Sequence, residues 1–161
     1  MPAIAEDRFV VKTGRQYPLG STPDDKGTNF SIFSPQADAV ELLLFDAHDD
    51  VEPMFIVKLD ARVHKTFQFW HVYVEGVRPG THYAYRIHGP NDPKRGLRFN
   101  NKKVLIDPYS KGNTKSLWRR ADACGLEDNL ATSLRSVVID SSKFTKRVHI
   151  NRPMSESIIY E

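Results

Sequence analysis

The strongest constraint on this chain is a pair of alternating segments joined by a short turn-forming stretch. In "TFQFWHVYVEG", from Thr66 to Gly76, and in "THYAYRIHG", from Thr81 to Gly89, apolar residues recur at every second position. Side chains of a strand point alternately to opposite faces, so this period of two predicts β-strands with one buried face. We predict that the two strands pair as a hairpin, with Val74 opposite Thr81.

The two faces of this hairpin differ in character. One face is continuous and apolar, and it carries Trp70, Val72, Val74, Tyr83, Tyr85 and Ile87. The other face is mixed, and it carries Phe69, His71, Tyr73, His82, Ala84, Arg86 and His88. Burying histidine and arginine without partners costs free energy, so the apolar face is expected in the core. The mixed face is then free to meet solvent, a ligand or another domain.

Three further segments read as strands before the hairpin. They are "TNFSIFS" (Thr28–Ser34), "AVELLLFD" (Ala39–Asp46) and "MFIVKLD" (Met54–Asp60). No long stretch among them shows the 3.6-residue period of a helix. Several short strands at this spacing indicate an all-β sandwich or barrel.

The C-terminal third of the chain is polar and irregular. A weak helix signal covers "SLWRRADACGL" (Ser116–Leu126), and one short apolar run, "SVVID", covers Ser136–Asp140. Long segments without regular structure are uncommon inside a compact domain, so we expect this one to pack on something else. We also expect the chain after Pro108 to be held less tightly than the strands. The ending "SIIYE" (Ser157–Glu161) resembles the start of a new element.

Composition narrows the classes of partner and compartment. Lys and Arg number 23 against 20 Asp and Glu, and a net charge of +3 is too mild to indicate nucleic-acid binding by itself. The single cysteine, Cys124, cannot form an internal disulfide, which is typical of a reducing compartment. Glu6 and Asp7 stand where a signal peptide needs an apolar core, and no apolar run approaches the roughly 20 residues of a membrane span. We therefore expect a cytoplasmic protein without a nucleic-acid or membrane partner.

Motifs for catalysis, metals and cofactors do not occur in the sequence. The six histidines form no HxxxH or HExxH pattern, and there is no GxSxG, no Walker loop and no GxGxxG. The acidic cluster Asp46, Asp49, Asp50 and Glu52 lies at an expected turn, whereas glycoside hydrolysis needs two carboxylates across a cleft. We predict no catalytic residue, no metal and no cofactor.

Three rings are candidates for carbohydrate contact because they are expected outside the main core. His71, Tyr73 and Trp118 could stack against the apolar faces of sugars. They could instead pack against another domain, which is the interpretation we favour from the residues alone.

Four stretches together resemble the start of bacterial glycogen debranching enzymes and isoamylases. The first two are "YPLGSTPDDKGTNFSIFSPQADAVELLLFD" (Tyr17–Asp46) and "WHVYVEGVRPGTHYAYRIHGP" (Trp70–Pro90). The others are "GLRFNNKKVLIDPYSKG" (Gly96–Gly112) and "IIYE" (Ile158–Glu161), and all four occur in the order of that family. The combination "YRIHGP…GLRFN…LIDPYSK" resembles the glycogen debranching branch more than the branching enzymes.

The resemblance implies an immunoglobulin-like antiparallel β-sandwich of the family-48 carbohydrate-binding-module type. Residues 1–13 would be an N-terminal extension, 14–107 the sandwich, 108–156 an irregular linker or docking segment, and 157–161 the start of a TIM barrel. In the family, that barrel belongs to glycoside hydrolase family 13 and hydrolyses α-1,6 branch linkages with retention. The catalytic carboxylates follow the first barrel strand, so this chain is expected to be inactive by itself.

The same resemblance implies the partners and a set of docking residues. The partners would be the chain's own catalytic domain and, through the parent enzyme, an α-glucan such as glycogen or limit dextrin. Arg86, His88, Asp107 and Tyr109 are the candidates for docking to the barrel. Glycan-binding members carry a lysine where this chain has Ala84, and a tryptophan in the turn that here reads Ala47–Asp50. A supporting role with weak glucan contact is therefore expected, and an autonomous glycogen-binding module is the alternative.

Overall fold

The computed structural model describes residues 8–144, 153–156 and 158. Most of the segment 157–161, which we expected to start a barrel strand, lies outside these residues, as do His149 and residues 1–7. The strands are β1 (Val10–Lys12), β2 (Gly20–Pro23), β3 (Gly27–Phe33), β4 (Ala39–Phe45), β5 (Phe55–Leu59), β6 (Lys65–Thr66), β7 (Phe69–Glu75), β8 (His82–His88), β9 (Asn91–Asp92), β10 (Leu97–Arg98), β11 (Val104–Leu105) and β12 (Ser136–Val137). The helical elements are α1 (Arg120–Cys124) and the 3₁₀ turns η1 (Pro93–Arg95), η2 (Leu130–Thr132), η3 (Ser141–Lys143) and η4 (Met154–Glu156).

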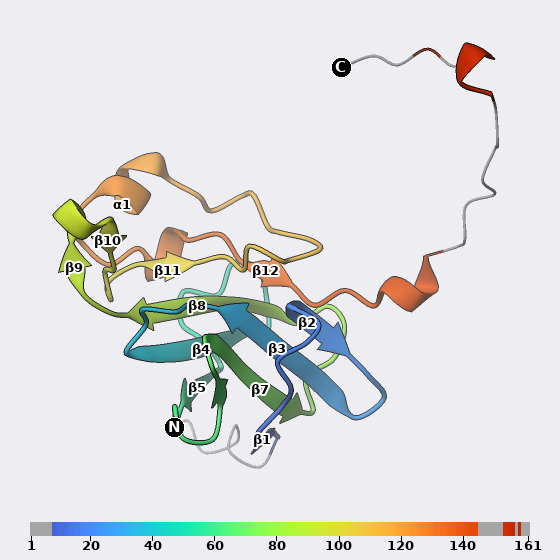
Figure 1. Cartoon of the computed structure of the whole chain (residues 1–161), viewed down its shortest axis with the longest axis horizontal. Helices are drawn as coiled ribbons and strands as arrows, with labels where there is room; N and C mark the ends of the chain where they lie inside the picture. The colour runs from blue at the N-terminus through green and yellow to red at the C-terminus, as the bar shows by residue number, and fades with distance from the viewer. Residues whose placement is uncertain (1–7, 145–152, 157, 159–161) are drawn as a thin grey trace.

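Two antiparallel five-stranded sheets face each other, which confirms the predicted β-sandwich. In the first sheet β7 lies between β3 and the shorter strands β1 and β6, and β2 pairs with the far edge of β3. In the second sheet β8 lies between β4 and the shorter strands β11 and β12, and β5 pairs with the far edge of β4. Figure 1 shows β7 and β8 as the long central strands of the two layers.

The core lies between these sheets and follows the alternation of the strands. The inward residues Trp70 and Val72 of β7 lie opposite Ile32 and Phe30 of β3, and all are buried. Across the core, the rings of Phe30 and Tyr83 meet edge to face with centroids 4.9 Å apart. This contact joins the two sheets, because β3 and β8 belong to different sheets.

The predicted pairing of the two central strands is wrong, although their buried faces are predicted correctly. β7 pairs with β3 and β8 pairs with β4, so Val72 and Tyr83 belong to different sheets of one core instead of lying side by side in a hairpin. The connection between Gly76 and Thr81 crosses from one sheet to the other. It is anchored at both ends, because the Gly76 amide donates to the Lys26 carbonyl and the Gly80 amide to the Val138 carbonyl. The two polar faces of the expected hairpin therefore lie on opposite outer surfaces of the molecule.

The sandwich begins earlier in the chain than we predicted. Phe9 is buried in the core, and β1 pairs with β7 over residues that we assigned to an extension. The turn-rich stretch after Gly14 contributes β2, which pairs with β3. Both strands are short and lie at sheet edges, so neither produces a strong alternating pattern.

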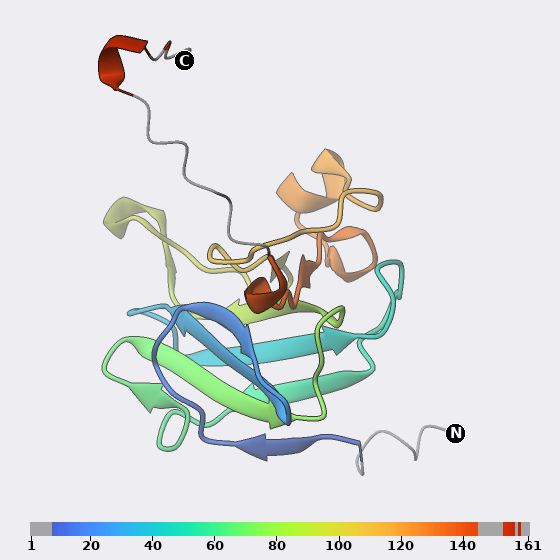
Figure 2. The same ribbon diagram turned by 90° about the vertical axis from the view of Figure 1, so that its right-hand side faces the viewer.

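The irregular segment from β11 to β12 forms a third layer, which covers the outer face of the second sheet (Figure 2). β11 and β12 pair along one edge of β8, and the chain between them passes over Leu43, Phe45 and Ala84. These three side chains form a small second core with Val104, and Leu130 packs against it. The segment up to residue 144 thus has a packing partner within this chain.

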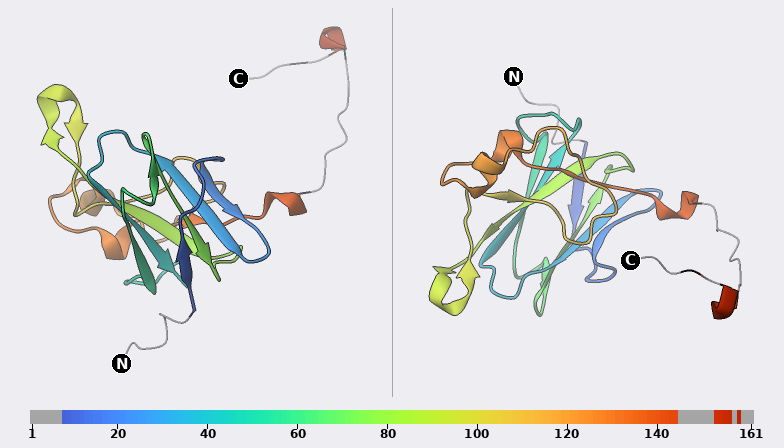
Figure 3. Two further views of the ribbon diagram at one scale, coloured as in Figure 1. Left: turned by 60° about the horizontal axis from the view of Figure 1, so that its bottom comes forward. Right: turned by 90° about the horizontal axis from the view of Figure 1, so that it is seen from above.

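The expected exit loop at residues 90–98 is an ordered ribbon. β9 and β10 pair with Leu97 opposite Asp92, and η1 forms the turn between them. This ribbon projects from one end of the sandwich, as both panels of Figure 3 show. The weak helix signal before Leu126 is confirmed by α1, which is only five residues long.

Candidate functional site

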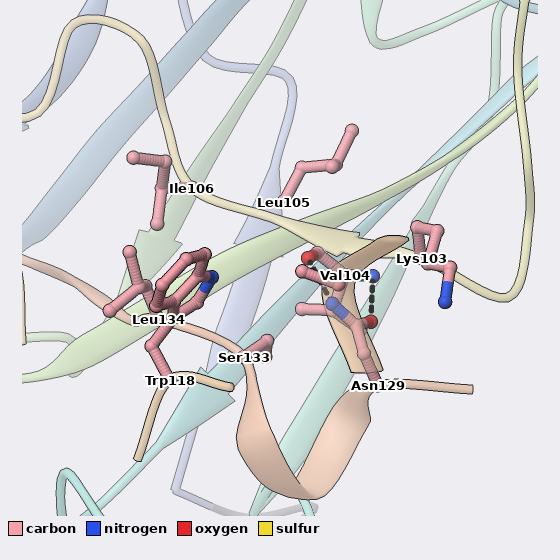
Figure 4. A pocket seen from close by; sticks show the side chains of 9 residues that line it. Lys103, Val104, Leu105, Ile106, Trp118, Asn129, Ser133 and Leu134 are labelled. Carbon is pink, nitrogen blue, oxygen red and sulfur yellow. Dashed lines mark hydrogen bonds between the residues drawn. The ribbon is translucent and has the colours of Figure 1, made fainter. Parts of the chain in front are cut away.

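Trp118 lies at the surface of the third layer, in a pocket of about 180 Å³. Its side chain is 46% exposed and lies beside Leu134, with Ile106 and Leu105 on the neighbouring strand segment (Figure 4). Leu105 is 47% exposed, so the pocket presents an apolar surface to its surroundings.

The Asn129 and Lys103 side chains that line the Trp118 pocket are already engaged in hydrogen bonds. The Asn129 amide pairs with the backbone of Val104, accepting from its N–H at 2.7 Å and donating to its carbonyl at 3.3 Å. The Lys103 ammonium donates to the carbonyls of Asp122 and Glu127. Sugar recognition needs free hydrogen-bonding groups around the ring, whereas an apolar pocket with satisfied polar groups is suited to packing. The geometry of this pocket therefore favours docking over specific sugar contact.

His71 and Tyr73 lie on the outer face of the first sheet, on the opposite side of the molecule from the third layer. His71 is buried, and its ring nitrogens contact the Thr13 carbonyl at 2.9 Å and the Thr66 hydroxyl at 2.8 Å. It holds the loop before β2 against the sheet and presents no free face to a ligand. The three predicted glucan-binding residues are thus not brought together.

Tyr73 forms a local pair at the edge of a polar pocket of about 440 Å³. Its hydroxyl donates to the Asp24 carboxylate at 2.7 Å. Burial, followed by this hydrogen bond, raises the pKa of Tyr73 to about 12. The hydrogen bond from Tyr73 lowers the pKa of Asp24.

The four predicted docking residues separate into two groups. Asp107 is buried, and it accepts from the Tyr83 hydroxyl and the Tyr109 amide, each at 2.8 Å. Burial raises the pKa of Asp107, and the two donors offset part of this rise. Arg86 pairs at 2.7 Å with Asp128, which belongs to the third layer of the same chain. Both side chains are therefore engaged by partners within this chain.

The other two predicted docking residues remain accessible. The His88 ring lies 3.7 Å from Glu41 and lines a pocket of about 600 Å³ at the base of the ribbon. Tyr109 is 48% exposed, and its backbone packs against Gly20. A Cβ on Gly20 would lie 2.7 Å from the Tyr109 carbonyl oxygen, so that position requires glycine.

Within the described residues, no group of three or more His, Cys, Asp or Glu side chains could hold a metal. Asp50 of the acidic cluster closes its own turn by accepting from the Asp46 and Ala47 amides at 3.0 and 2.8 Å. No helix of the described part of the chain is long and apolar enough to cross a membrane.

Sequence reasoning missed an exposed row of aromatic rings on the first sheet. Tyr17, Phe69 and Phe33 follow one another, with 5.2 Å between the centroids of each neighbouring pair. The alternating pattern could have identified two of these rings, because Phe69 and Phe33 occupy outward positions of their strands. Tyr17 comes from a turn-rich loop whose path over the sheet has no sequence pattern.

Similar proteins of known structure share the fold. A product complex of the glycogen-degrading pneumococcal virulence factor SpuA matches 91% of this chain and 14% of its own, with a TM-score of 0.57 and 17% identity. A pullulanase from Bacillus acidopullulyticus matches 76% of this chain and 12% of its own, with a TM-score of 0.51 and 17% identity.

Two curated relatives carry the name glycogen debranching enzyme. The protein from Erwinia tasmaniensis is 46% identical over 102 residues, covering 63% of this chain and 15% of the relative. The protein from Salmonella typhi is 36% identical over 155 residues, covering 92% of this chain and 23% of the relative. The chain therefore spans less than a quarter of the length of either relative. The family model for carbohydrate-binding module 48, the isoamylase N-terminal domain, matches residues 18–110. That match covers more than half of the 161 residues, so the chain belongs to the carbohydrate-binding module 48 family.

Proposed function

We propose that this chain is a non-catalytic accessory domain of a glycogen debranching enzyme. The observation that carries the proposal is the match to carbohydrate-binding module 48, together with relatives of that name that are more than four times longer. In this proposal the parent enzyme hydrolyses α-1,6 branch linkages of glycogen or limit dextrin with retention. The present chain supports and orients its catalytic domain.

The third layer supports this role because it occupies the sheet face where a glucan site would otherwise lie. Ala84, at the position of the lysine of glycan-binding members, is fully buried under Val104 and Leu130. On the same face, the centroid of the Phe45 ring lies 3.9 Å from the guanidinium carbon of Arg135. A sugar could reach this face only if the third layer were displaced.

The surface offered to a catalytic domain is the apolar pocket around Trp118 and Leu105, with Tyr109 and His88 as further candidates. An exposed apolar patch rimmed by polar residues is typical of an interaction site. In the parent enzyme, Trp118→Ala is expected to lower the melting temperature, while the isolated 161-residue chain melts as before. Equal shifts in both proteins would mean that Trp118 acts only within this domain.

A direct assay tests the expectation that this chain alone does not hydrolyse glucan. Incubation of the chain with glycogen limit dextrin should release no reducing ends, because retaining hydrolysis needs two carboxylates flanking the scissile bond. Sustained release that scales with the concentration of the chain would contradict the accessory role. The alternative function, an autonomous glycogen-binding module, has one structural observation in its favour, which is the aromatic row on the opposite sheet.

A further inference from the structure

We infer that Tyr17, Phe69 and Phe33, the aromatic row, form a contact site for an α-glucan chain on the outer face of the first sheet. The inference rests on the proposed function for its ligand class, because it assumes that the parent acts on α-glucan. The proposed contact lies on the sheet opposite Ala84 and away from Trp118.

The row is exposed and continuous. Tyr17 is 54% exposed and Phe33 is 44% exposed, with Phe69 between them. Phe33 and Phe69 are direct cross-strand partners of β3 and β7, so the sheet fixes two of the three rings. No charged or aliphatic residue belongs to the row.

The backbone that leads to the third ring, Tyr17, is held by hydrogen bonds from the sheet, and the ring itself packs against Phe69. The Asn29 side chain exchanges two hydrogen bonds with the backbone of Arg15, at 2.8 and 2.9 Å. The Ser31 hydroxyl donates to the Gln16 carbonyl at 2.7 Å, and His71 contacts the Thr13 carbonyl. Three outward polar side chains thus hold the loop immediately before Tyr17. A ring that is ordered before binding loses little conformational entropy when a ligand arrives.

The turn that precedes β7 adds a second sign of an interaction surface. Phe67 adopts φ of 52°, in the left-handed region that disfavours a side chain, and it is 90% exposed. A large apolar residue at a strained and solvated turn position does not assist folding. Strain of this kind clusters at sites of function.

The size of the row fits a few sugar units better than a protein partner. Three partly exposed aromatic side chains offer roughly 200–300 Å² of apolar surface, whereas a standard protein interface buries about 800 Å² on each side. With 5.2 Å between centroids, neighbouring rings of the row touch each other and form one continuous apolar surface.

The test is affinity electrophoresis of the 161-residue chain in native gels that contain glycogen, with maltoheptaose as the competitor. The wild type should be retarded. Tyr17→Ser and Phe33→Thr should each raise the apparent Kd by about tenfold, and the double variant should migrate as in a glycogen-free gel. Phe144→Ser removes another exposed ring, on the C-terminal segment, and is the matched control that should bind as the wild type does. Melting curves of each variant show that the domain remains folded.

Three outcomes would overturn the inference. An unretarded wild type would show that the row binds no glucan, while the supporting role would still stand on the Trp118 comparison in the parent. Retardation that survives the double variant but is lost in Trp118→Ala would move the contact to the third layer. A concentration-dependent dimer that the double variant abolishes, without retardation by glycogen, would assign the row to a second copy of the chain.

Discussion

Arg135 is the residue that fixes the third layer to the sandwich. It is fully buried, although arginine is rarely so, and burial lowers its pKa to about 10. Its guanidinium donates to the carbonyls of Ser133 and Leu130 at 3.0 and 2.6 Å and lies over the Phe45 ring. One cation therefore connects the chain before β12 to the outer face of β4.

We expect Arg135→Met to lower the free energy of unfolding by about 2–3 kcal/mol. The substitution keeps much of the buried volume, but it removes the guanidinium donor of the Ser133 carbonyl and leaves the Leu130 carbonyl with only the Ser133 hydroxyl, at 3.3 Å. Chemical denaturation measures the loss, and Arg120→Met on the exposed face of α1 is the matched control. A loss no larger than that of the control would show that the guanidinium contributes nothing to the layer.

His64 makes stability depend on pH near neutrality. Its Nδ1 accepts a hydrogen bond from the Asp60 amide at 3.0 Å, which requires an unprotonated Nδ1. Burial, and then the neighbouring His71, lowers the pKa of His64 below the ordinary value of 6.5, against the opposing effect of Asp60. The unfolded chain then binds more protons than the folded one, so stability is present above pH 6.5 and falls as the pH drops through that value.

The prediction for His64 compares the melting temperatures of the wild type and of the His64→Asn variant at two pH values. His64→Asn keeps an acceptor for the Asp60 amide but cannot titrate, so its melting temperature should fall less than that of the wild type between pH 7.5 and pH 5.5. Thermal melts at the two pH values provide the comparison. Identical shifts would place the titration elsewhere in the molecule.

At the scale of elements, the third layer acts as the cover of the second sheet. Leu43, Phe45 and Ala84 on the outer face have no exposed surface. Each fully buried large apolar side chain contributes about 1.5–3 kcal/mol. A chain that ends after Ser110 should therefore lose several kcal/mol of stability and bind a hydrophobic dye, whereas a chain that ends after Phe144 is the matched control. Dye fluorescence as low in the shorter chain as in the control would contradict the covering role.

The turn between β6 and β7 is expected to become more stable when its aromatic residue is removed. Phe67→Gly relieves a left-handed φ of 52° and removes a ring that buries almost nothing, so the free energy of unfolding should rise by about 0.5–1 kcal/mol. Gln68→Gly, at the next position, has no such strain to relieve and should lower it. Chemical denaturation of both variants measures these changes. A lower free energy of unfolding in Phe67→Gly would mean that the Phe67 ring makes stabilising contacts.

Sequence patterns predicted the elements whose signal is local. The alternation of Trp70, Val72 and Val74 identified a buried strand face, and the same holds for Tyr83 and Tyr85. It could not identify the partner of either strand, because a buried face is satisfied equally by a neighbour in the sheet or by a ring across the core. The partners depend on the whole arrangement of sheets, which no local period encodes.

The candidate site was predictable only in part, for a related reason. The accessible ring of Trp118 was expected outside the main core and is found there. Asp107 and His71 were expected at the surface, but their hydrogen bonds run to Tyr83 and to Thr13, which lie far away in the sequence. Tyr17 reaches the sheet through a loop whose position depends on three distant side chains.

At the scale of the whole molecule, the domain has two different outer surfaces. The second sheet is sealed by the chain's own C-terminal layer, which presents the Trp118 pocket outward. The first sheet carries the aromatic row next to a loop held against it by hydrogen bonds. A supporting domain with this division would contact a catalytic domain on one side and substrate on the other.

The most direct test of this division is a titration of the isotope-labelled chain with maltoheptaose, followed by the chemical shifts of its backbone amides. We expect the changes to gather at residues 13–17 and around Phe33 and Phe69, with the third layer unaffected. Changes centred on Ala84 and Arg86, or on Trp118, would contradict it, because the glucan would then be bound at the face that the third layer covers or by that layer itself.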